Sequence, residues 1–394
     1  MSLTSDLATS LKPQRAARVI PEVSLRAWIM RRLYRSFGRV AVALLTRTTV
    51  IGRENIPEGP ALLAGNHFSS YDAPVIIMHY PFGIQSVGFA DFRKSWKAKF
   101  LYDSVDAIPI HRTSVDRKAM NAMIDVLKRG GKLALYPEGG SWEKGFYDVK
   151  DGVAYLSMVT GVPIVPIAVN GTYDVWRRVC RLQRPRITIE FGEPLPPVAS
   201  ADRKTRRQEL QQASEDLMHT IYGMLDDDDL IHYATIERQC FTGRLEIQAG
   251  KRGAAPLAGE LAEAADQRFD VLAELFSKQN MFTPFHEHER LPMKPFLKAR
   301  FFKAADFKVS VDALYEALNG RFKGFLTYRI GEDKEERGRV EIETLKRLAD
   351  LAVEHDLKLR FTSEVWLTEP VPSADEIRAQ MGLPARTDGA QLSG

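Results

Sequence analysis

Cysteine is scarce in this chain of 394 residues, which has only Cys180 and Cys240. The two lie far apart and lack the spacing of metal ligands, so the sequence offers neither a disulfide framework nor a zinc site. We therefore expect no metal centre and a reducing, cytoplasmic environment.

Long apolar runs are missing as well. The sequence has no stretch of about 18 or more uninterrupted apolar residues, the length that would indicate a membrane span. Residues 1–6 do not join a basic leader to an apolar run, which argues against a secretory signal. We expect a protein that is soluble or bound to a membrane surface.

The net charge is small, at +4, and the chain is 44% hydrophobic and 27% charged. Such a balance is typical of a globular protein and is too mild to indicate a nucleic-acid partner. The length exceeds that of one typical domain. We therefore expect two domains and no binding to nucleic acid.

The charge is unevenly distributed, because residues 24–47 contain six arginines and no acidic residue. Apolar residues recur there at helical spacing: Leu25, Trp28, Ile29, Leu33, Phe37, Val40, Ala41 and Leu44. Such a helix can lie on an anionic membrane, with its apolar face down and its arginines toward the phosphates. Alternatively, it packs on its own domain and leaves the arginines in solvent. We expect residues 1–50 to be a leader followed by this membrane-surface helix.

From residue 51, short apolar runs alternate with helical stretches. This alternation predicts an α/β domain over residues 51–226, with a mixed, largely parallel sheet flanked by helices. In such sheets the chemistry gathers at the edge where loops leave the strands. The expected strands are residues 61–64, 86–90, 107–110, 132–136, 164–169 and 186–191.

The acidic run 226–229 favours a solvated linker, and we place the domain boundary there. Residues 230–380 are expected to form a small additional α+β region of unknown role, and residues 381–394 a disordered tail. In that region the pattern predicts helices over 257–279, 309–318 and 341–355, and strands over 324–330 and 357–366.

A histidine and an aspartate five positions apart stand at the junction of a buried strand and a helix. His67 and Asp72 follow the apolar run 61–65. A histidine can take a proton from a hydroxyl, and a carboxylate on its other ring nitrogen fixes the tautomer and stabilises the imidazolium. The alternative is an ordinary turn histidine beside a helix-capping aspartate.

Three further stretches stand at strand ends or in apolar strands. Residues 107–112 end on Arg112, whose guanidinium can hold a phosphate by two hydrogen bonds, or which is simply an exposed arginine before a helix. Residues 136–141 form a tight turn in which Glu138 can accept from a hydroxyl or fix a neighbouring cation. Residues 162–168 form an apolar strand with two prolines, which either lines an acyl channel or is an edge strand of the core.

In this order and spacing, the four stretches resemble the glycerolipid acyltransferase family, which includes the lysophosphatidic acid acyltransferases. The family pattern is Asn-His-x4-Asp, a strand ending in arginine, Phe-Pro-Glu-Gly-Thr and a Val-Pro-x-x-Pro strand. The chain departs from it at Tyr136 and Gly140, and the missing threonine hydroxyl leaves the acceptor open. The matching positions are Asn66, His67, Asp72, Arg112, Pro137, Glu138, Gly139 and residues 162–166.

The resemblance implies direct acyl transfer from the thioester of acyl-CoA or acyl-carrier-protein, with no other cofactor and no metal. His67, held by Asp72, would take the proton of the acceptor hydroxyl. The substrate-binding residues would be Asn66, Arg112, Glu138 and Gly139, with Arg112 positioning the acceptor's phosphate. Membrane lipids would serve as surface and substrate, which implies a peripheral protein on the cytoplasmic side of a membrane. The alternatives are another lipid acceptor, a thioester or ester hydrolase, and a lipid-binding protein on the same fold.

Overall fold

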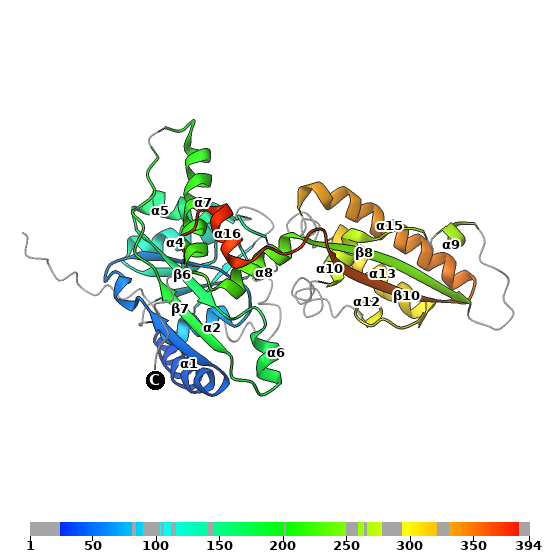
Figure 1. Ribbon diagram of the computed structural model, residues 1–394, viewed down its shortest axis with the longest axis horizontal. Helices are drawn as coiled ribbons and strands as arrows, with labels where there is room; N and C mark the ends of the chain where they lie inside the picture. Colours follow the sequence, from blue (N-terminus) through cyan, green and yellow to red (C-terminus); the bar gives the residue numbers. More distant parts are fainter. Residues whose placement is uncertain are drawn as a thin grey trace, which may run out of the picture.

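The computed structural model describes two β-sheets, each with its own helices, that follow one another along the chain (Figure 1). Our predictions for the leader, for a strand over 324–330 and for residues 386–394 of the tail lie outside the described residues. Those are residues 24–80, 84–89, 103, 106–111, 116–140, 145–147, 149–200, 202–249, 259–263, 266–277, 294–320 and 331–385. The expected disorder from residue 381 is wrong for the described part of the tail, because Met381 ends a helix and Leu383 is buried in the core.

The first sheet has seven strands in the order β1-β7-β6-β2-β5-β3-β4. All neighbours run parallel except β6 and β7, so the prediction of a mixed, largely parallel sheet is confirmed. The strands are β1 Arg47–Ile51, β2 Ala61–Gly65, β3 Ile84–Phe89, β4 Ile108–Ile110, β5 Lys132–Leu135, β6 Ile164–Asn170 and β7 Arg186–Phe191.

Helices cover both faces of this sheet, which is why its central strands read as unbroken apolar runs. Every residue of β2 and β6 is buried. Alternate residues enter separate cores: Leu62 packs with residues of α4, α5, α7 and α8, and Leu63 packs with residues of α1 and α2. These helices, with the short α6, are α1 Leu25–Leu45, α2 Asp72–His79, α4 Arg117–Lys128, α5 Gly152–Thr160, α6 Val175–Cys180, α7 Arg206–Met224 and α8 Asp227–Glu237.

The stretch with two prolines forms β6, which begins just after Pro163 and contains Pro166, and β6 lies in the middle of the sheet between β2 and β7. It is therefore a core strand and not the edge strand that we considered. Pro166 lies opposite Gly192, just past the end of β7, and still takes part in the pairing through its carbonyl, which accepts from Gly192 N–H at 2.9 Å. With both faces buried in the core, β6 gives no support to an acyl channel.

The acidic run that we expected to be a solvated linker instead begins helix α8. Asp229 is 0% exposed, and the next turn places Leu230 and Tyr233 in the core of the first sheet. Near the chain end, helix α16 (Ala374–Met381) returns to this core through Ile377. The core of the first sheet therefore draws on residues from both sides of the boundary that we placed at the acidic run.

The second sheet is antiparallel and has three strands in the order β8-β10-β9. Alternate residues of β10, such as Leu359 and Phe361, face a core filled by α10, α13 and α15, which confirms a small α+β region. In the described part of 257–279, two short helices stand in place of the single helix that we expected. The elements are β8 Gln239–Ala249, α9 Glu260–Glu263, α10 Asp270–Ser277, α12 Lys294–Leu297, β9 Phe302–Lys303, α13 Ala304–Asn319, α15 Glu332–Glu354 and β10 Leu357–Leu367.

Candidate active site

The His67–Asp72 motif spans the turn from β2 to α2, as the sequence predicted. β2 ends at Gly65, and α2 begins at Asp72. Parallel strands β5 and β6 flank β2, so the carboxyl ends of all three meet at one edge of the sheet. The motif therefore sits where α/β sheets commonly place reactive groups.

The two side chains form a hydrogen-bonded pair with a distance of 2.8 Å between His67 Nδ1 and Asp72 Oδ2. Asp72 Oδ2 also accepts from the backbone N–H of Ser69 at 2.8 Å. Asp72 is 0% exposed and His67 is 9% exposed, so water competes little for this contact. The alternative, an ordinary turn histidine beside a helix-capping aspartate, does not fit, because Tyr71 is the N-cap of α2 and Asp72 bonds to the His67 ring.

The carboxylate decides which ring nitrogen acts as the base. Because Asp72 Oδ2 accepts from the ring, His67 Nδ1 carries the proton, and Nε2 presents its lone pair. No hydrogen-bond partner of Nε2 is found among the described residues. The arrangement can take a proton from a hydroxyl at Nε2 and stabilise the imidazolium through Asp72.

Tyr136 fixes the plane of the imidazole. The two rings stack with centroids 3.9 Å apart and an angle of 17° between their planes. Burial raises the pKa of the Tyr136 phenol well above its ordinary value, so the residue stays neutral. Tyrosine at this position therefore preserves an aromatic ring against the base, although the family pattern has phenylalanine.

Glu138 holds the backbone of His67 in place. Its Oε2 accepts from His67 N–H at 3.0 Å, and its Oε1 accepts from the Tyr233 hydroxyl. Glu138 is buried, and its charge raises the pKa of Tyr233 beyond the effect of burial. Glu138 thus links the histidine turn to helix α8, a connection that the sequence prediction did not contain.

Tyr233→Phe should lower kcat about tenfold while leaving KM for both substrates within about twofold, because the lost hydrogen bond to a carboxylate contributes about 1.5–3 kcal/mol. The ring remains in the core, so folding is expected to survive. Steady-state kinetics of the variant measure the effect. Tyr147→Phe, which removes a hydroxyl that bonds to His219, is the matched control. An unchanged kcat would remove Tyr233 from the site.

Asn66 belongs to the scaffold and not to the substrate-contacting surface that we expected. Its Nδ2 donates to Val169 O at 3.1 Å, and its Oδ1 accepts from Val169 N at 2.8 Å. The side chain is fully buried. Asn66 therefore ties the end of β2 to β6 and has no exposed surface to offer a substrate.

Gly139 closes the tight turn after β5. Its φ of 77° lies in the left-handed region, which suits glycine, and its N–H donates to Tyr136 O at 2.9 Å. The turn orients Tyr136 and Glu138 toward His67. Arg112 lies outside the described residues, so its role in holding phosphate stays a prediction.

An aromatic wall that the sequence prediction missed extends from His67 toward α6. Phe68 contacts His232 with ring centroids 5.4 Å apart, and His232 stacks on Tyr173 at 4.4 Å. Burial lowers the pKa of His232 to about 4, so this histidine is neutral at neutral pH. His232 therefore contributes packing rather than charge beside the base.

Sheet and site together define an α/β domain with a His–Asp base at a strand edge. Residues 47–170 match the family model described as Acyltransferase. This part of the chain is therefore similar to the family that the sequence motifs resemble.

Relatives with curated names agree with this family. The 1-acyl-sn-glycerol-3-phosphate acyltransferase of Cocos nucifera is 26% identical over 168 residues, covering 40% of this chain and 53% of that protein. The enzyme of the same name from Limnanthes douglasii is 28% identical over 149 residues, covering 36% and 51%. The chain spans about half the length of these relatives.

Among solved structures, the 1-acyl-sn-glycerophosphate (LPA) acyltransferase PlsC from Thermotoga maritima is similar to this chain. It is 21% identical, with a TM-score of 0.38, and the match covers 49% of this chain and 80% of that one.

Proposed function

We propose that the protein transfers a fatty acyl group from acyl-CoA or acyl-carrier-protein to the hydroxyl of a lysophospholipid such as 1-acylglycerol-3-phosphate. It would do so as a peripheral protein on the cytoplasmic side of a membrane and would serve phospholipid biosynthesis. The observation that carries the proposal is the buried His67–Asp72 pair at the strand edge of an acyltransferase domain.

The proposed reaction needs only groups that the chain and its substrates supply. His67 Nε2 takes the proton as the acceptor oxygen attacks the thioester carbonyl. The C–S bond then breaks, and the departing thiolate receives that proton from the imidazolium. Asp72 stabilises the imidazolium between these steps, and positioning of the hydroxyl beside Nε2 supplies much of the rate.

A screen of acceptors tests this proposal. Radiolabelled acyl-CoA is incubated with the protein and with individual lysophospholipids in mixed vesicles, and the lipid products are separated by chromatography. We expect a labelled diacyl lipid with at least one acceptor. If no acceptor becomes acylated with either acyl-CoA or acyl-carrier-protein as donor, the proposal fails.

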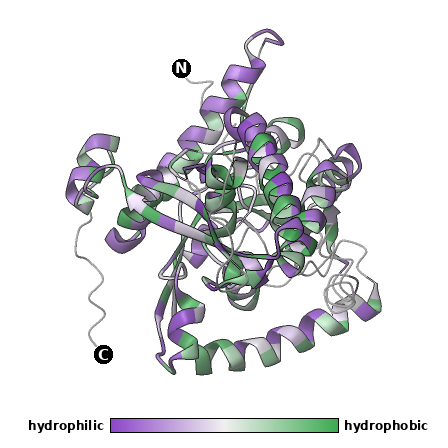
Figure 2. Ribbon diagram, turned by 90° about the vertical axis from the view of Figure 1, so that its right-hand side faces the viewer, coloured by the Kyte–Doolittle hydropathy of each residue, from purple (hydrophilic) through white to green (hydrophobic). Residues whose placement is uncertain are grey.

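Association with a membrane is supported by the surface of α1. No helix among the described residues is long and apolar enough to cross a bilayer. On α1, however, a row of apolar side chains faces solvent, with Phe37 74% and Leu44 70% exposed. Figure 2 shows apolar residues along this helix, which runs along the lower edge of that view. The row consists of Leu25, Trp28, Ile29, Leu33, Phe37, Val40, Leu44 and Leu45.

Several arginines of α1 face the protein, contrary to our expectation that they would face lipid phosphates or solvent. Arg35 is buried and donates to Tyr80 O at the end of α2, and Arg39 donates to Met78 O at 2.7 Å. Gly38 lets the helices approach, because a Cβ there would collide with the side chain of Met78. The arginines thus attach α1 to α2 and leave its apolar row for a bilayer.

Phe37→Glu combined with Leu44→Glu should weaken binding to anionic liposomes by about tenfold or more, because each apolar side chain gains roughly 1.5–3 kcal/mol on full burial. Sedimentation with liposomes measures the binding. The matched control replaces Val309 and Val340 by glutamate, since these are exposed apolar residues of α13 and α15. An equal loss of liposome binding in both double variants would show that the added negative charge alone weakens binding, and it would contradict a role for α1.

A further inference from the structure

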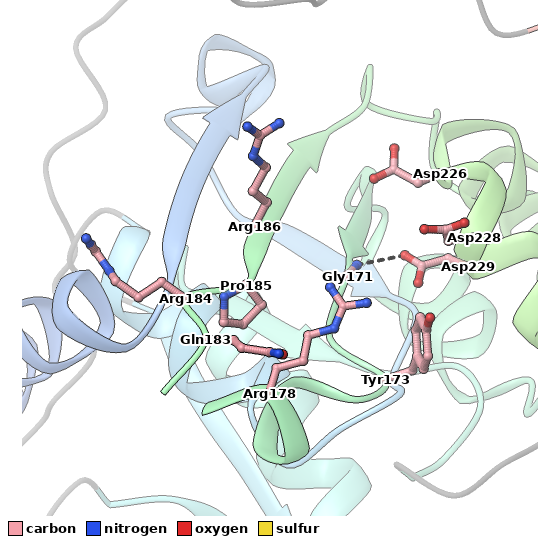
Figure 3. Close-up of a pocket in the computed structure, with 10 residues that line it drawn as sticks. All are labelled: Gly171, Tyr173, Arg178, Gln183, Arg184, Pro185, Arg186, Asp226, Asp228 and Asp229. Atoms are coloured by element: carbon pink, nitrogen blue, oxygen red, sulfur yellow. Dashed lines mark hydrogen bonds between the residues drawn. The ribbon is translucent and has the colours of Figure 1, made fainter. Parts of the chain in front are cut away.

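A polar pocket opens beside the candidate active site, with a volume of about 430 Å³. Figure 3 shows its two walls. The segment from α6 to the start of β7 supplies arginines, and the start of α8 supplies aspartates. The lining residues used below are Arg178, Arg184, Arg186, Asp226, Asp228 and Asp229.

The arginine wall has one guanidinium without a partner. Arg178 is paired with Asp174, with Nε 2.8 Å from Oδ1, and Arg184 donates to the backbone carbonyl of Ala43. For the exposed Arg186, no side-chain hydrogen bond or ion pair occurs within the described part of the chain. Arg186 is therefore the cation of this wall that can receive an anionic group.

The aspartate wall contains a buried oxygen that lacks a donor. Asp229 Oδ2 accepts from Gly171 N–H at 2.9 Å, whereas Oδ1 has no hydrogen-bond partner among the described residues, although the residue is 0% exposed. In Figure 3 the carboxylate points from α8 into the pocket. Burial, together with the charges of Asp226 and Asp72, raises the pKa of Asp229 to about 8, and a cation bound at Oδ1 would favour its charged form. A buried carboxylate of this kind is costly unless a donor or cation binds it.

The pocket lies at the same edge of the sheet as His67. β6 is the neighbour of β2 and runs parallel to it, so Gly171, just past the end of β6, adjoins the histidine turn. β7 is antiparallel to β6 and begins at Arg186, which brings Arg186 to that edge too. Phe68, next to His67, contacts Tyr173 of the pocket edge to face, with ring centroids 6.5 Å apart. A substrate can therefore extend from the base into this pocket.

We propose that this pocket receives the ammonium end of a zwitterionic acceptor headgroup, with the ammonium donating to Asp229 Oδ1 and the phosphate of the same headgroup facing Arg186. A lone anion would meet three aspartates, and a metal ion would face the arginines of the opposite wall. A primary ammonium supplies the missing donor, whereas a quaternary ammonium has no N–H. The inference rests on the proposed acyl transfer and narrows its acceptor to lysophospholipids with a phosphoethanolamine-type headgroup.

Binding of headgroup fragments tests the subsite independently of catalysis. Isothermal titration calorimetry of the full chain uses phosphoethanolamine, phosphocholine, ethanolamine and inorganic phosphate. We expect phosphoethanolamine to bind at least tenfold more tightly than each of the other three. Equal affinity for phosphoethanolamine and inorganic phosphate, or for phosphoethanolamine and phosphocholine, would overturn the proposal.

Asp229→Asn tests the assigned oxygen, because asparagine can still accept from Gly171 N–H while it loses the charge. We expect it to weaken phosphoethanolamine binding about tenfold or more, and Asp228→Asn, at an exposed position, to weaken it less. Asp216→Asn, on the exposed surface of α7, is the matched control, and thermal unfolding verifies that each variant is folded. Wild-type affinity in both folded pocket variants would contradict the assignment.

Kinetics then connect the subsite to turnover. We expect wild-type kcat/KM for a phosphoethanolamine lysolipid to exceed that for 1-acylglycerol-3-phosphate about tenfold, and this ratio to fall toward one in Asp229→Asn. An unchanged ratio would separate the pocket from the acceptor and refute the inference. If the wild type acylates no acceptor, the proposed function fails, but the calorimetry still decides whether the pocket binds the headgroup.

Discussion

His67→Ala should lower kcat for acyl transfer about 10³-fold, because a positioned general base contributes about 10²–10⁴-fold. His232, which contacts Phe68 beside the base, cannot replace it, because its pKa is lowered to about 4 and its ring stacks on Tyr173. The loss should appear in kcat, since Nε2 acts on the acceptor proton during the reaction. Steady-state rates with saturating donor and acceptor measure it.

The control for this variant is His219→Ala, which removes a histidine of α7 that bonds only to Tyr147 among the described residues. It should keep wild-type turnover. Circular dichroism and thermal unfolding show whether both variants are folded. Turnover within tenfold of the wild type in folded His67→Ala would exclude His67 as the base.

Replacements of Asp72 should separate the role of its charge from that of its hydrogen bonds. Asp72→Ala leaves the N–H groups of His67 Nδ1 and Ser69 without their acceptor, so the tautomer that presents Nε2 as the base is no longer fixed. We expect kcat to fall about 10³-fold, which is close to the loss of the base itself.

Asp72→Asn should be milder because both hydrogen bonds go to the same oxygen, Oδ2. The Ser69 N–H orients the amide so that its oxygen occupies that place and still accepts from His67. Only the charge that stabilises the imidazolium is lost, which predicts a decrease in kcat of about 10- to 100-fold for about 1.5–3 kcal/mol. Equal rates for the asparagine and alanine variants would contradict this division of roles.

The alternation of apolar runs and helical stretches was sufficient to predict the fold of the first sheet. All six expected strands are present, because buried parallel strands have an apolar pattern that few other elements share. Strand β1 was missed because Thr46 is the one residue between it and α1. The helical spacing of apolar residues in α1 therefore gave no sign of where the helix ends. Helix α8 was missed because its three acidic residues are typical of a linker, although they also favour a helix N-terminus.

The sequence predicted the His67–Asp72 pair but not its supports. Tyr233 lies 95 positions from Glu138, and no local pattern links a tyrosine on one helix to a carboxylate in a distant turn. Asn66 and Glu138 could either bind substrate or stabilise the histidine turn, and the same residue types suit both roles. The two roles are distinguished only by the burial of these side chains and by their hydrogen-bond partners in the folded protein.

The orientation of α1 illustrates the same limit. Periodicity identifies an apolar row and a basic row, but it does not say which row contacts the protein. Arginine has a long apolar stem and a charged end that can reach the carbonyl groups at a helix C-terminus, so it can pack inward at low cost. That contact, and not the apolar row, attaches α1 to α2.

Stoichiometry tests the central claim of direct acyl transfer most directly. The CoA thiol released, the acylated lipid formed and the free fatty acid formed are measured in one reaction with acyl-CoA and a lysophospholipid. The proposed roles of His67 and Asp72 predict one acylated lipid for each thiol released, and no free fatty acid above a control lacking protein. Thiol release matched by free fatty acid, with no acylated lipid, would instead show a hydrolase and contradict the proposed function.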